Sequence, residues 1–211
     1  MYDQGSPEWF AERIGKVTAS RVADVIAKTK TGYSTSRANY AAQLIAERLT
    51  GNVAESYSNA AMEWGVMTEA EARTAYEFLT DATVDQVGFV NHPMITMTGA
   101  SPDGLVGEFG LVEIKCPITA THIETLLGQS VPKKYVTQMM WQMACTGRQW
   151  CDFVSYDPRL PESMRLFVRR VERDAVMIAE LELAIRTFLD EIDATVARLR
   201  ALYDPQGKVA T

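Results

Sequence analysis

Cysteine and histidine are scarce in this chain, and their scarcity excludes several kinds of site. The 211 residues include three cysteines (Cys116, Cys145 and Cys151) and two histidines (His92 and His122). An odd number of cysteines without a C-x-x-C pair argues against a disulfide-stabilised secreted domain and indicates a reducing compartment. We do not expect a structural zinc site, because only these two histidines are available to join the three cysteines, which form no C-x-x-C pair. We expect both histidines to be structural or surface residues.

Long apolar runs and an excess of basic residues are also missing. No stretch of about 18 apolar residues occurs, so no transmembrane helix is predicted. The first residues, MYDQGSPEWF, lack the basic and apolar regions of a signal peptide. We therefore expect a cytoplasmic protein without membrane contact. The net charge of −6 argues mildly against a nucleic-acid partner.

The charges are unevenly distributed along the chain. Seven Lys or Arg residues accompany two acids between Arg13 and Arg48, whereas seven acids accompany four arginines between Glu172 and Arg200. A basic N-terminal face could follow phosphates while the rest of the surface stays acidic. An ordinary solvated surface accounts for the same distribution equally well.

Capping residues and periodicity predict helices at both ends of the chain and a sheet between them. The expected helices cover residues 7–15 after a Ser6 cap, a short segment after a Thr18 cap, 36–50, 59–78, 121–127, 132–145 and a last helix from Asp174. Residues 28–35 read as a polar loop. The expected strands cover residues 83–91, 95–98, 104–106, 111–116, 150–156 and 164–171, with a hairpin turn at 107–110.

This order predicts one α+β domain over residues 1–211. Residues 1–80 form a mainly helical part, 81–171 a central mixed sheet with helices packed against it, and 172–211 a C-terminal helix.

Charged side chains gather on two of the expected strands. Residues two apart on a strand share a face, about 6–7 Å apart, so Glu113 and Lys115 point the same way while Val112 and Ile114 point into the core. If residues 103–106 pair with 111–116, Asp103 comes close to Glu113. Two carboxylates and an ammonium would then meet on an otherwise apolar sheet.

Such a buried group is costly unless its members satisfy one another or hold a metal. Carboxylate oxygens suit Mg²⁺ or Mn²⁺. A metal could activate water for phosphodiester hydrolysis, with Lys115 orienting or deprotonating that water and its pKa lowered by the nearby metal. The order Pro102-Asp103, nine residues, then Glu113-Ile114-Lys115 matches the PD-(D/E)xK nuclease signature. A surface hairpin with a cross-strand Glu–Lys pair is the simpler alternative.

Further blocks of sequence carry a family resemblance. They are Glu8-Trp9-Phe10 through Arg13-Ile14-Gly15, Val17-Thr18-Ala19-Ser20, Trp64-Gly65 with Glu69, Ser101-Pro102-Asp103-Gly104, Glu113-Ile114-Lys115-Cys116-Pro117, Gln138 and Tyr156-Asp157-Pro158-Arg159. In their order and approximate spacing, the chain resembles the phage lambda exonuclease family, the YqaJ-like viral recombinases, over roughly residues 8–200. The resemblance implies a restriction-endonuclease-like core.

The resemblance also implies roles for the residues of the metal centre. Asp103 and Glu113 would hold two Mg²⁺ ions, with Mn²⁺ able to substitute and the Ile114 carbonyl as an extra ligand. Lys115 would be the catalytic lysine, and Glu69 would approach through a metal-bound water. A helix pair between Glu69 and Arg73 is the alternative for that acid.

Other implied roles concern the DNA end. Arg13 and Ser20 would bind the 5′-terminal phosphate, and Gln138 would contact the same site. Arg13 as a surface residue and Ser20 as a first-turn helix residue are the alternatives. Met62 could wedge between the terminal base pairs, or belong to the core.

Two further points follow from the same comparison. Lys30 could reach into a groove of the duplex. Met140 stands where the family often has a second glutamine, which puts a two-glutamine contact in doubt.

The implied activity is that of a Mg²⁺-dependent 5′→3′ exonuclease on double-stranded DNA ends, which releases mononucleotides and leaves a 3′ single strand. A homotrimeric ring, a single-strand annealing protein as partner, and a phage or prophage gene expressed in a bacterial host are implied as well. A structure-specific endonuclease with the same metal centre, or a non-catalytic DNA-binding recombination scaffold, remain as alternatives.

Overall fold

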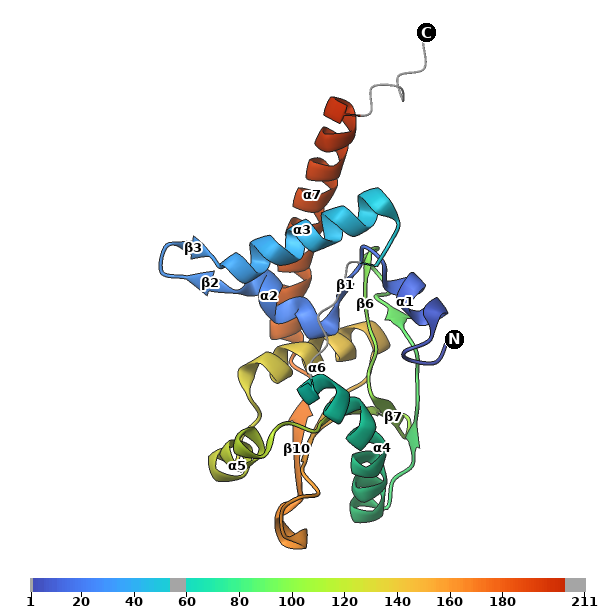
Figure 1. Ribbon diagram of the computed structural model, residues 1–211, viewed down its shortest axis with the longest axis vertical. Helices are drawn as coiled ribbons and strands as arrows, with labels where there is room; N and C mark the ends of the chain where they lie inside the picture. The colour runs from blue at the N-terminus through green and yellow to red at the C-terminus, as the bar shows by residue number, and fades with distance from the viewer. Residues whose placement is uncertain (1, 54–59, 204–211) are drawn as a thin grey trace.

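The computed structural model describes residues 2–53 and 60–203, except for the side chains of residues 60–63 and 66. Its α-helices are α1 (Pro7–Arg13), α2 (Val22–Ile26), α3 (Thr35–Thr50), α4 (Ala60–Thr80), α5 (Thr119–Gly128), α6 (Lys133–Thr146) and α7 (Ala175–Tyr203), with 3-10 turns η1 (Ala19–Arg21) and η2 (Glu162–Met164). Its strands are β1 (Val17–Thr18), β2 (Lys28–Thr29), β3 (Gly32–Tyr33), β4 (Val84–Asp85), β5 (Val90–Asn91), β6 (Thr98–Ala100), β7 (Gly104–Val106), β8 (Gly110–Lys115), β9 (Trp150–Tyr156) and β10 (Leu166–Glu172). The order helices, sheet, helices confirms the expected α+β class (Figure 1).

A five-stranded mixed sheet forms the centre of the molecule, in the order β10-β9-β8-β7-β4. β8 and β9 are parallel, and the other neighbours are antiparallel. The predicted hairpin is present, because Gly104 pairs with Val112 and Val106 with Gly110. Gly107 sits in its turn at φ +53°, a conformation that favours glycine. β8 therefore lies inside the sheet, with a strand on each side.

The alternating side chains of β8 bind the sheet to two different helical layers. Val112 and Ile114 pack on one face with Ala72 and Tyr76 of α4. Leu111 belongs to the cluster on the other face, which contains much of α6. This alternation is the one expected from the sequence, and it sends Glu113 and Lys115 toward α6.

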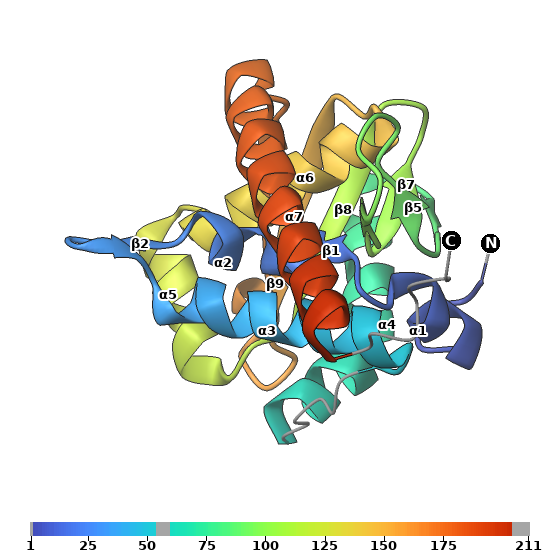
Figure 2. The ribbon, with the colours of Figure 1, turned by 90° about the horizontal axis from the view of Figure 1, so that it is seen from above.

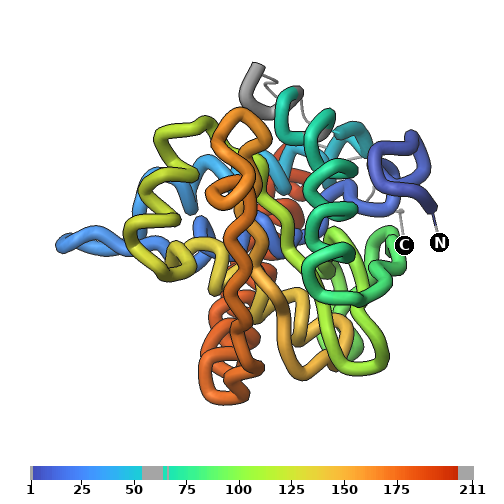
Figure 3. Tube along the Cα trace, turned by 90° about the horizontal axis from the view of Figure 1, so that it is seen from below, coloured from blue at the N-terminus to red at the C-terminus, as the bar shows by residue number. Residues whose placement is uncertain are grey.

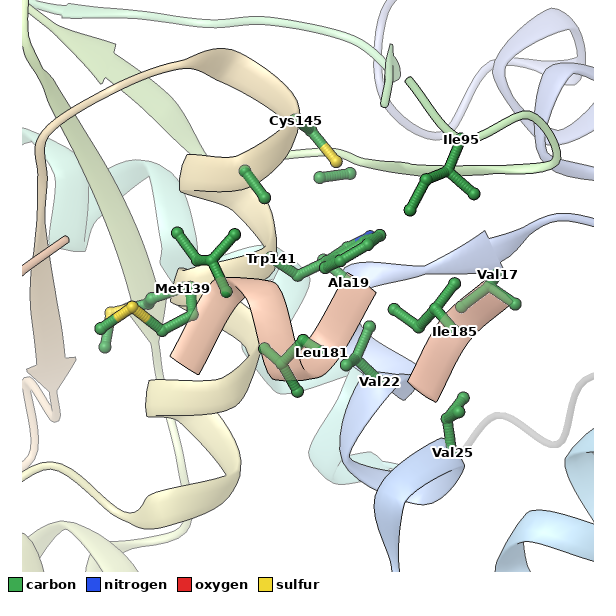
Figure 4. Close-up of a cluster of buried hydrophobic side chains, with 14 of the residues drawn as sticks. Val17, Ala19, Val22, Val25, Ile95, Met139, Trp141, Cys145, Leu181 and Ile185 are labelled. Atoms are coloured by element: carbon green, nitrogen blue, oxygen red, sulfur yellow. The ribbon is translucent and has the colours of Figure 1, made fainter. Parts of the chain in front are cut away.

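A large apolar cluster lies beyond α6 and joins it to α2 and α7. Figure 4 shows Trp141 of α6 among Val22, Leu181 and Ile185, all of them buried. The indole N–H of Trp141 donates to Thr98 Oγ1 at 3.1 Å, so the one polar group of this side chain is satisfied inside the core. Figure 2 shows α7 crossing above α6 and α3.

The N-terminal part differs from the expectation in two places. Thr18 directly precedes η1, as expected of a cap, but its side chain makes no capping hydrogen bond. It ends β1, which pairs in parallel with β6, and its N–H donates to Tyr40 Oη at 3.1 Å. Residues 28–35 contain the β2–β3 hairpin, which projects from the body of the molecule (Figures 1 and 3). Pairings with distant segments, or between strands this short, leave little periodicity for sequence analysis to detect.

Other expected boundaries are met closely. Ser6 accepts a hydrogen bond from Trp9 N and caps α1, and Gly51 and Gly147 end α3 and α6 at positive φ. Residues 83–91, expected as one strand, form β4 and β5 in different sheets. None of the helices within residues 2–53 and 60–203 has the length and apolarity needed to cross a bilayer.

Both histidines are buried structural residues, as expected. His122 bridges Ser155 Oγ at 2.7 Å and the Met164 carbonyl at 2.9 Å. His92 stacks on Trp141 with ring centres 4.9 Å apart. The three cysteines are free, buried thiols.

Candidate active site

The β7–β8 hairpin brings Asp103 to Glu113, as the sequence predicts. Asp103 lies one residue before β7, and its Oδ2 accepts a hydrogen bond from Ile114 N at 2.6 Å. Glu113 lies in the middle of β8 and is fully buried. Lys115 follows on the same face and forms an ion pair with Glu113 Oε1. The three charged groups of the nuclease signature are therefore in one place.

Two glutamines of α6 hold the buried carboxylate from the opposite side. Gln138 Nε2 donates to Glu113 Oε1 at 2.6 Å, and Gln142 Nε2 donates to Glu113 Oε2 at 2.5 Å. Met140 is buried and its position contributes no amide, and the doubt that it raised about a two-glutamine contact with DNA stays a prediction. Gln142, four residues after Gln138 and so on the same side of the helix, supplies the second amide. That four-residue spacing is the local signal in the sequence for a second amide at Glu113.

Burial and the neighbouring charges shift the pKa values of Asp103 and Lys115. Burial, and then the charge of Glu113, raise the pKa of Asp103 well above its usual range. Burial lowers the pKa of Lys115, but Glu113 and Asp103 outweigh it, so the pKa is raised. The expected lowering of this pKa depends on a divalent ion beside the ammonium. The protein groups alone keep Lys115 protonated.

Glu69 reaches the edge of this centre from α4. Its carboxylate pairs with Arg73 at 2.7 Å, the helix pair weighed as the simpler alternative. Its charge nevertheless contributes to raising the pKa of Asp103, so the two acids lie within electrostatic range. The role of Glu69 through a metal-bound water stays a prediction.

The donor set fits a hard divalent cation. Two carboxylates that repel each other in a buried position are stabilised by a counter-charge. Asp103, Glu113 and the Ile114 carbonyl would supply part of the coordination shell, and water and substrate oxygens would supply the rest, as in most Mg²⁺ sites.

A pocket of about 170 Å³ joins Asp103 to the basic N-terminal segment. Its lining consists of Gln4, Trp9, Arg13, Thr18, Ala19, Ser20, Ser101, Asp103 and Gln138. Arg13, Ser20 and Gln138, which the sequence analysis assigned to a 5′-phosphate, thus border one cavity with the metal-binding candidate Asp103. Their binding role stays a prediction.

Arg13 is held in this pocket by an aromatic ring. Its guanidinium carbon lies 3.7 Å from the centre of the Trp9 ring. Its Nε is buried and has no hydrogen-bond partner, and burial lowers the pKa of the guanidinium. A desolvated cation with an unused donor is suited to receive an anion.

Side-chain bonds from the N-terminal segment fix the loop before β7. Trp9 Nε1 donates to Ser101 Oγ at 3.0 Å, and Gln4 Nε2 donates to the Pro102 carbonyl at 2.8 Å. These contacts explain why α1 lies against the loop that carries Asp103. Neither Trp9 nor Ser101 was assigned a role from the sequence, because each appeared only within a matched block.

One further expected DNA contact lies apart from this pocket, and another is not described by the structure. Lys30 is exposed in the turn of the β2–β3 hairpin and does not line the cavity. The side chain of Met62 lies outside the described residues. Both assignments stay predictions.

Comparison with known proteins places this geometry among phage recombination nucleases. The model of the YqaJ-like viral recombinase domain matches residues 8–149. A solved structure of LHK-Exo in complex with dAMP is 52% identical, with a TM-score of 0.90 over 95% of this chain and all of that one. The alkaline exonuclease LHK-Exo from Laribacter hongkongensis matches at 51% identity, with the same coverage and TM-score.

A more distant likeness supports the fold alone. A phage-related exonuclease from Haemophilus somnus 129PT is 14% identical, with a TM-score of 0.72 over 87% of this chain and 96% of that one. No curated protein sequence gave a significant match. The solved structures agree with the expected restriction-endonuclease-like fold.

Proposed function

We propose, from the premise that this chain belongs to the YqaJ-like viral recombinase family, that it is a Mg²⁺-dependent exonuclease that degrades the 5′-ended strand of linear duplex DNA. Its relatives make it a phage-type recombination exonuclease. The polarity, the duplex substrate and the metal are the proposed refinements.

The shared pocket is the observation that supports this proposal. Arg13 and Ser20 line it together with Asp103 and Gln138. A 5′-terminal phosphate and the next phosphodiester are neighbours along a DNA strand. A site that grips the first beside carboxylates that act on the second would release one nucleotide at a time from a 5′ end.

Each residue of the centre has a distinct task in this proposal. Asp103, Glu113 and the Ile114 carbonyl would hold Mg²⁺. The bound ion would supply a Lewis acid that lowers the pKa of water and neutralises charge on the phosphate. Lys115, protonated beside its carboxylates, would orient the attacking water and stabilise the negative charge that develops. Glu69 would hold a water at the edge of the centre.

The surroundings would adapt the centre to DNA ends. Met62 would separate the terminal base pairs and Lys30 would reach a groove of the duplex, since the β2–β3 hairpin projects from the protein surface. A homotrimeric ring around the duplex and a single-strand annealing protein that takes over the 3′ strand complete the proposal.

Digestion of a linear duplex labelled differently at its two 5′ ends tests polarity, end preference and metal dependence together. We expect Mg²⁺-dependent release of mononucleotides from 5′-phosphorylated ends, slower release from 5′-hydroxyl ends, and none in chelator. Lys115→Ala should be inactive but folded. A covalently closed circle should remain intact. Cleavage of the circle would favour an endonuclease, and full activity of Lys115→Ala would refute the site.

A further inference from the structure

A buried carboxylate immediately after β9 fixes the orientation of an arginine that lies near the end of β8. Asp157 is fully buried, and its oxygens accept from Arg159 Nε at 2.7 Å, Arg159 Nη2 at 2.9 Å and Arg159 N at 3.0 Å. The side chain of Thr119, the first residue of α5, also helps to lower the pKa of Asp157. A fork of parallel bonds fixes the plane of a guanidinium more firmly than a single ion pair does.

The fixed guanidinium contacts both elements that carry the outer residues of the active site. Arg159 Nη2 donates to the Pro117 carbonyl at 3.3 Å, two residues after Lys115. The Arg159 guanidinium carbon lies 4.4 Å from the centre of the Trp64 ring, on α4 five residues before Glu69. Arg159 thus joins the end of β8 to the helix that bears Glu69.

A second bond from the same segment secures α4. Tyr156, directly before Asp157, donates its hydroxyl to Glu71 Oε1 at 2.7 Å. The α4 helix also rests on the sheet through apolar contacts such as Ala72 with Val112 and Ile114, and the Tyr76 hydroxyl donates to Asp152 Oδ2 on β9 at 2.8 Å. Polar bonds at the end of β9 therefore contribute, at the Trp64–Glu71 part of α4, to where this helix sits relative to β8.

We infer that Arg159 is a positioning residue of the metal centre: by binding the Pro117 carbonyl and stacking on Trp64, it sets the distance between Glu69 and the Ile114–Lys115 end of β8. This inference rests on the proposed function, because it assigns Arg159 a role in that same site. Mutation of a residue that orients metal ligands without binding the metal itself commonly reduces metal affinity or activity by about 10- to 100-fold.

The chain contains a matched control at the other end of β9. Arg170 Nε and Nη2 bind the two oxygens of buried Asp152 at 2.8 and 2.9 Å, and its guanidinium carbon lies 3.5 Å from the Trp150 ring centre. The exposed fractions of the Arg159 and Arg170 side chains are 44% and 48%. Asp152 also accepts a hydrogen bond from the Tyr76 hydroxyl of α4. Arg170→Ala therefore removes the same kind of guanidinium interaction without touching Pro117 or Trp64, and it leaves the Tyr76 donor and the Asp152 acceptor in the chain.

The test combines metal binding with single-turnover kinetics on a 5′-phosphorylated duplex. Mn²⁺ binding is measured by electron paramagnetic resonance on wild type, Arg159→Ala, Arg159→Lys and Arg170→Ala, with unfolding followed in parallel. For Arg159→Ala we expect Mn²⁺ binding weakened and the cleavage rate at saturating DNA reduced, each by about tenfold or more, with the half-saturating DNA concentration within about twofold of wild type. Arg170→Ala should match wild type in Mn²⁺ affinity, cleavage rate and half-saturating DNA concentration.

The lysine variant separates positioning from direct contact with DNA. Lys cannot reproduce the guanidinium fork, so Arg159→Lys should remain defective in cleavage rate and Mn²⁺ affinity. If Arg159→Lys restores the cleavage rate and the Mn²⁺ affinity, a positive charge is sufficient and the inference is wrong. If Arg159→Ala only raises the half-saturating DNA concentration, Arg159 contacts DNA and the inference is also wrong. Equal defects in Arg170→Ala would also overturn it. Should Arg159→Ala not fold, Trp64→Leu removes the stacking surface and must show the same weakened Mn²⁺ binding.

The metal measurement keeps this inference distinct from the proposed function. A wild type that binds Mn²⁺ but does not degrade duplex ends would refute the proposed activity, while the affinities of the Arg159 variants would still decide the inference. Unchanged Mn²⁺ affinity in Arg159→Ala, alongside an active wild type, would refute the inference alone.

Discussion

Replacement of Gln142 by leucine should separate stability from activity at this site. Gln142 is fully buried, its Nε2 donates to Glu113 at 2.5 Å, and its Oε1 is buried without a partner. Losing a hydrogen bond to a charged group costs about 1.5–3 kcal/mol, whereas an unsatisfied buried polar atom costs about 1–3 kcal/mol. Gln142→Leu removes both at similar volume. We therefore expect its free energy of unfolding to stay within about 1–2 kcal/mol of wild type.

Activity should respond differently, because Glu113 would lose one of the groups that orient it. Gln138 and Lys115 would still contact the carboxylate, but only at Oε1. We expect the single-turnover rate at saturating Mg²⁺ to fall about 10- to 100-fold. Urea denaturation followed by circular dichroism gives the stability, and Met139→Leu serves as a buried control on the same helix. A variant that keeps its full rate, or that loses more than about 4 kcal/mol, would refute this reasoning.

Three further predictions concern charge, thiols and DNA contact. Burial opposes ionisation of Asp157, but hydrogen bonds from Arg159 and Thr119 lower its pKa to about 2. Its ionised form therefore stabilises the fold above pH 4 and loses that effect as the pH falls toward 2, so Asp157→Asn should flatten the acid limb of a stability–pH curve. Burial raises the pKa of the Cys116 thiol to about 12 and that of Cys151 well above its usual range, so a disulfide reagent at pH 8 should label the native protein slowly and the urea-unfolded protein at once. Lys30→Ala should leave the melting temperature unchanged and reduce the salt dependence of duplex binding by about one phosphate contact; an unchanged slope would exclude that contact.

The central hairpin could be predicted because its signals are local. Gly107 and Gly110 mark a turn, the alternation from Leu111 to Lys115 assigns each side chain to a face, and both features appear in the structure. Proximity of Asp103 to Glu113 then follows from the register of adjacent strands. Helix ends at Gly51 and Gly147 were visible for the same reason, since glycine at positive φ is a residue-level signal.

Contacts between distant segments could not be read in this way. Thr18 has the chemistry of a helix cap. Its backbone instead belongs to β1, which pairs with β6, and its N–H donates to the Tyr40 hydroxyl. The bonds of Gln142 to Glu113 and of Arg159 to Pro117 depend on how α6 and the end of β9 pack on β8. Spacing on α6 hinted at the first, whereas nothing in the local sequence indicates the second.

Arg13 has a buried, unpaired hydrogen-bond donor at the place where the protein is proposed to bind DNA. Its cation has already lost water to Trp9 and the surrounding wall, yet one donor remains unused. Folding thus bears the dehydration cost before any substrate arrives, and a phosphate that enters would gain the full strength of the contact. The hydrogen-bond acceptor for this donor would come from the DNA end, so an intact 5′ phosphate would complete the polar contacts of Arg13.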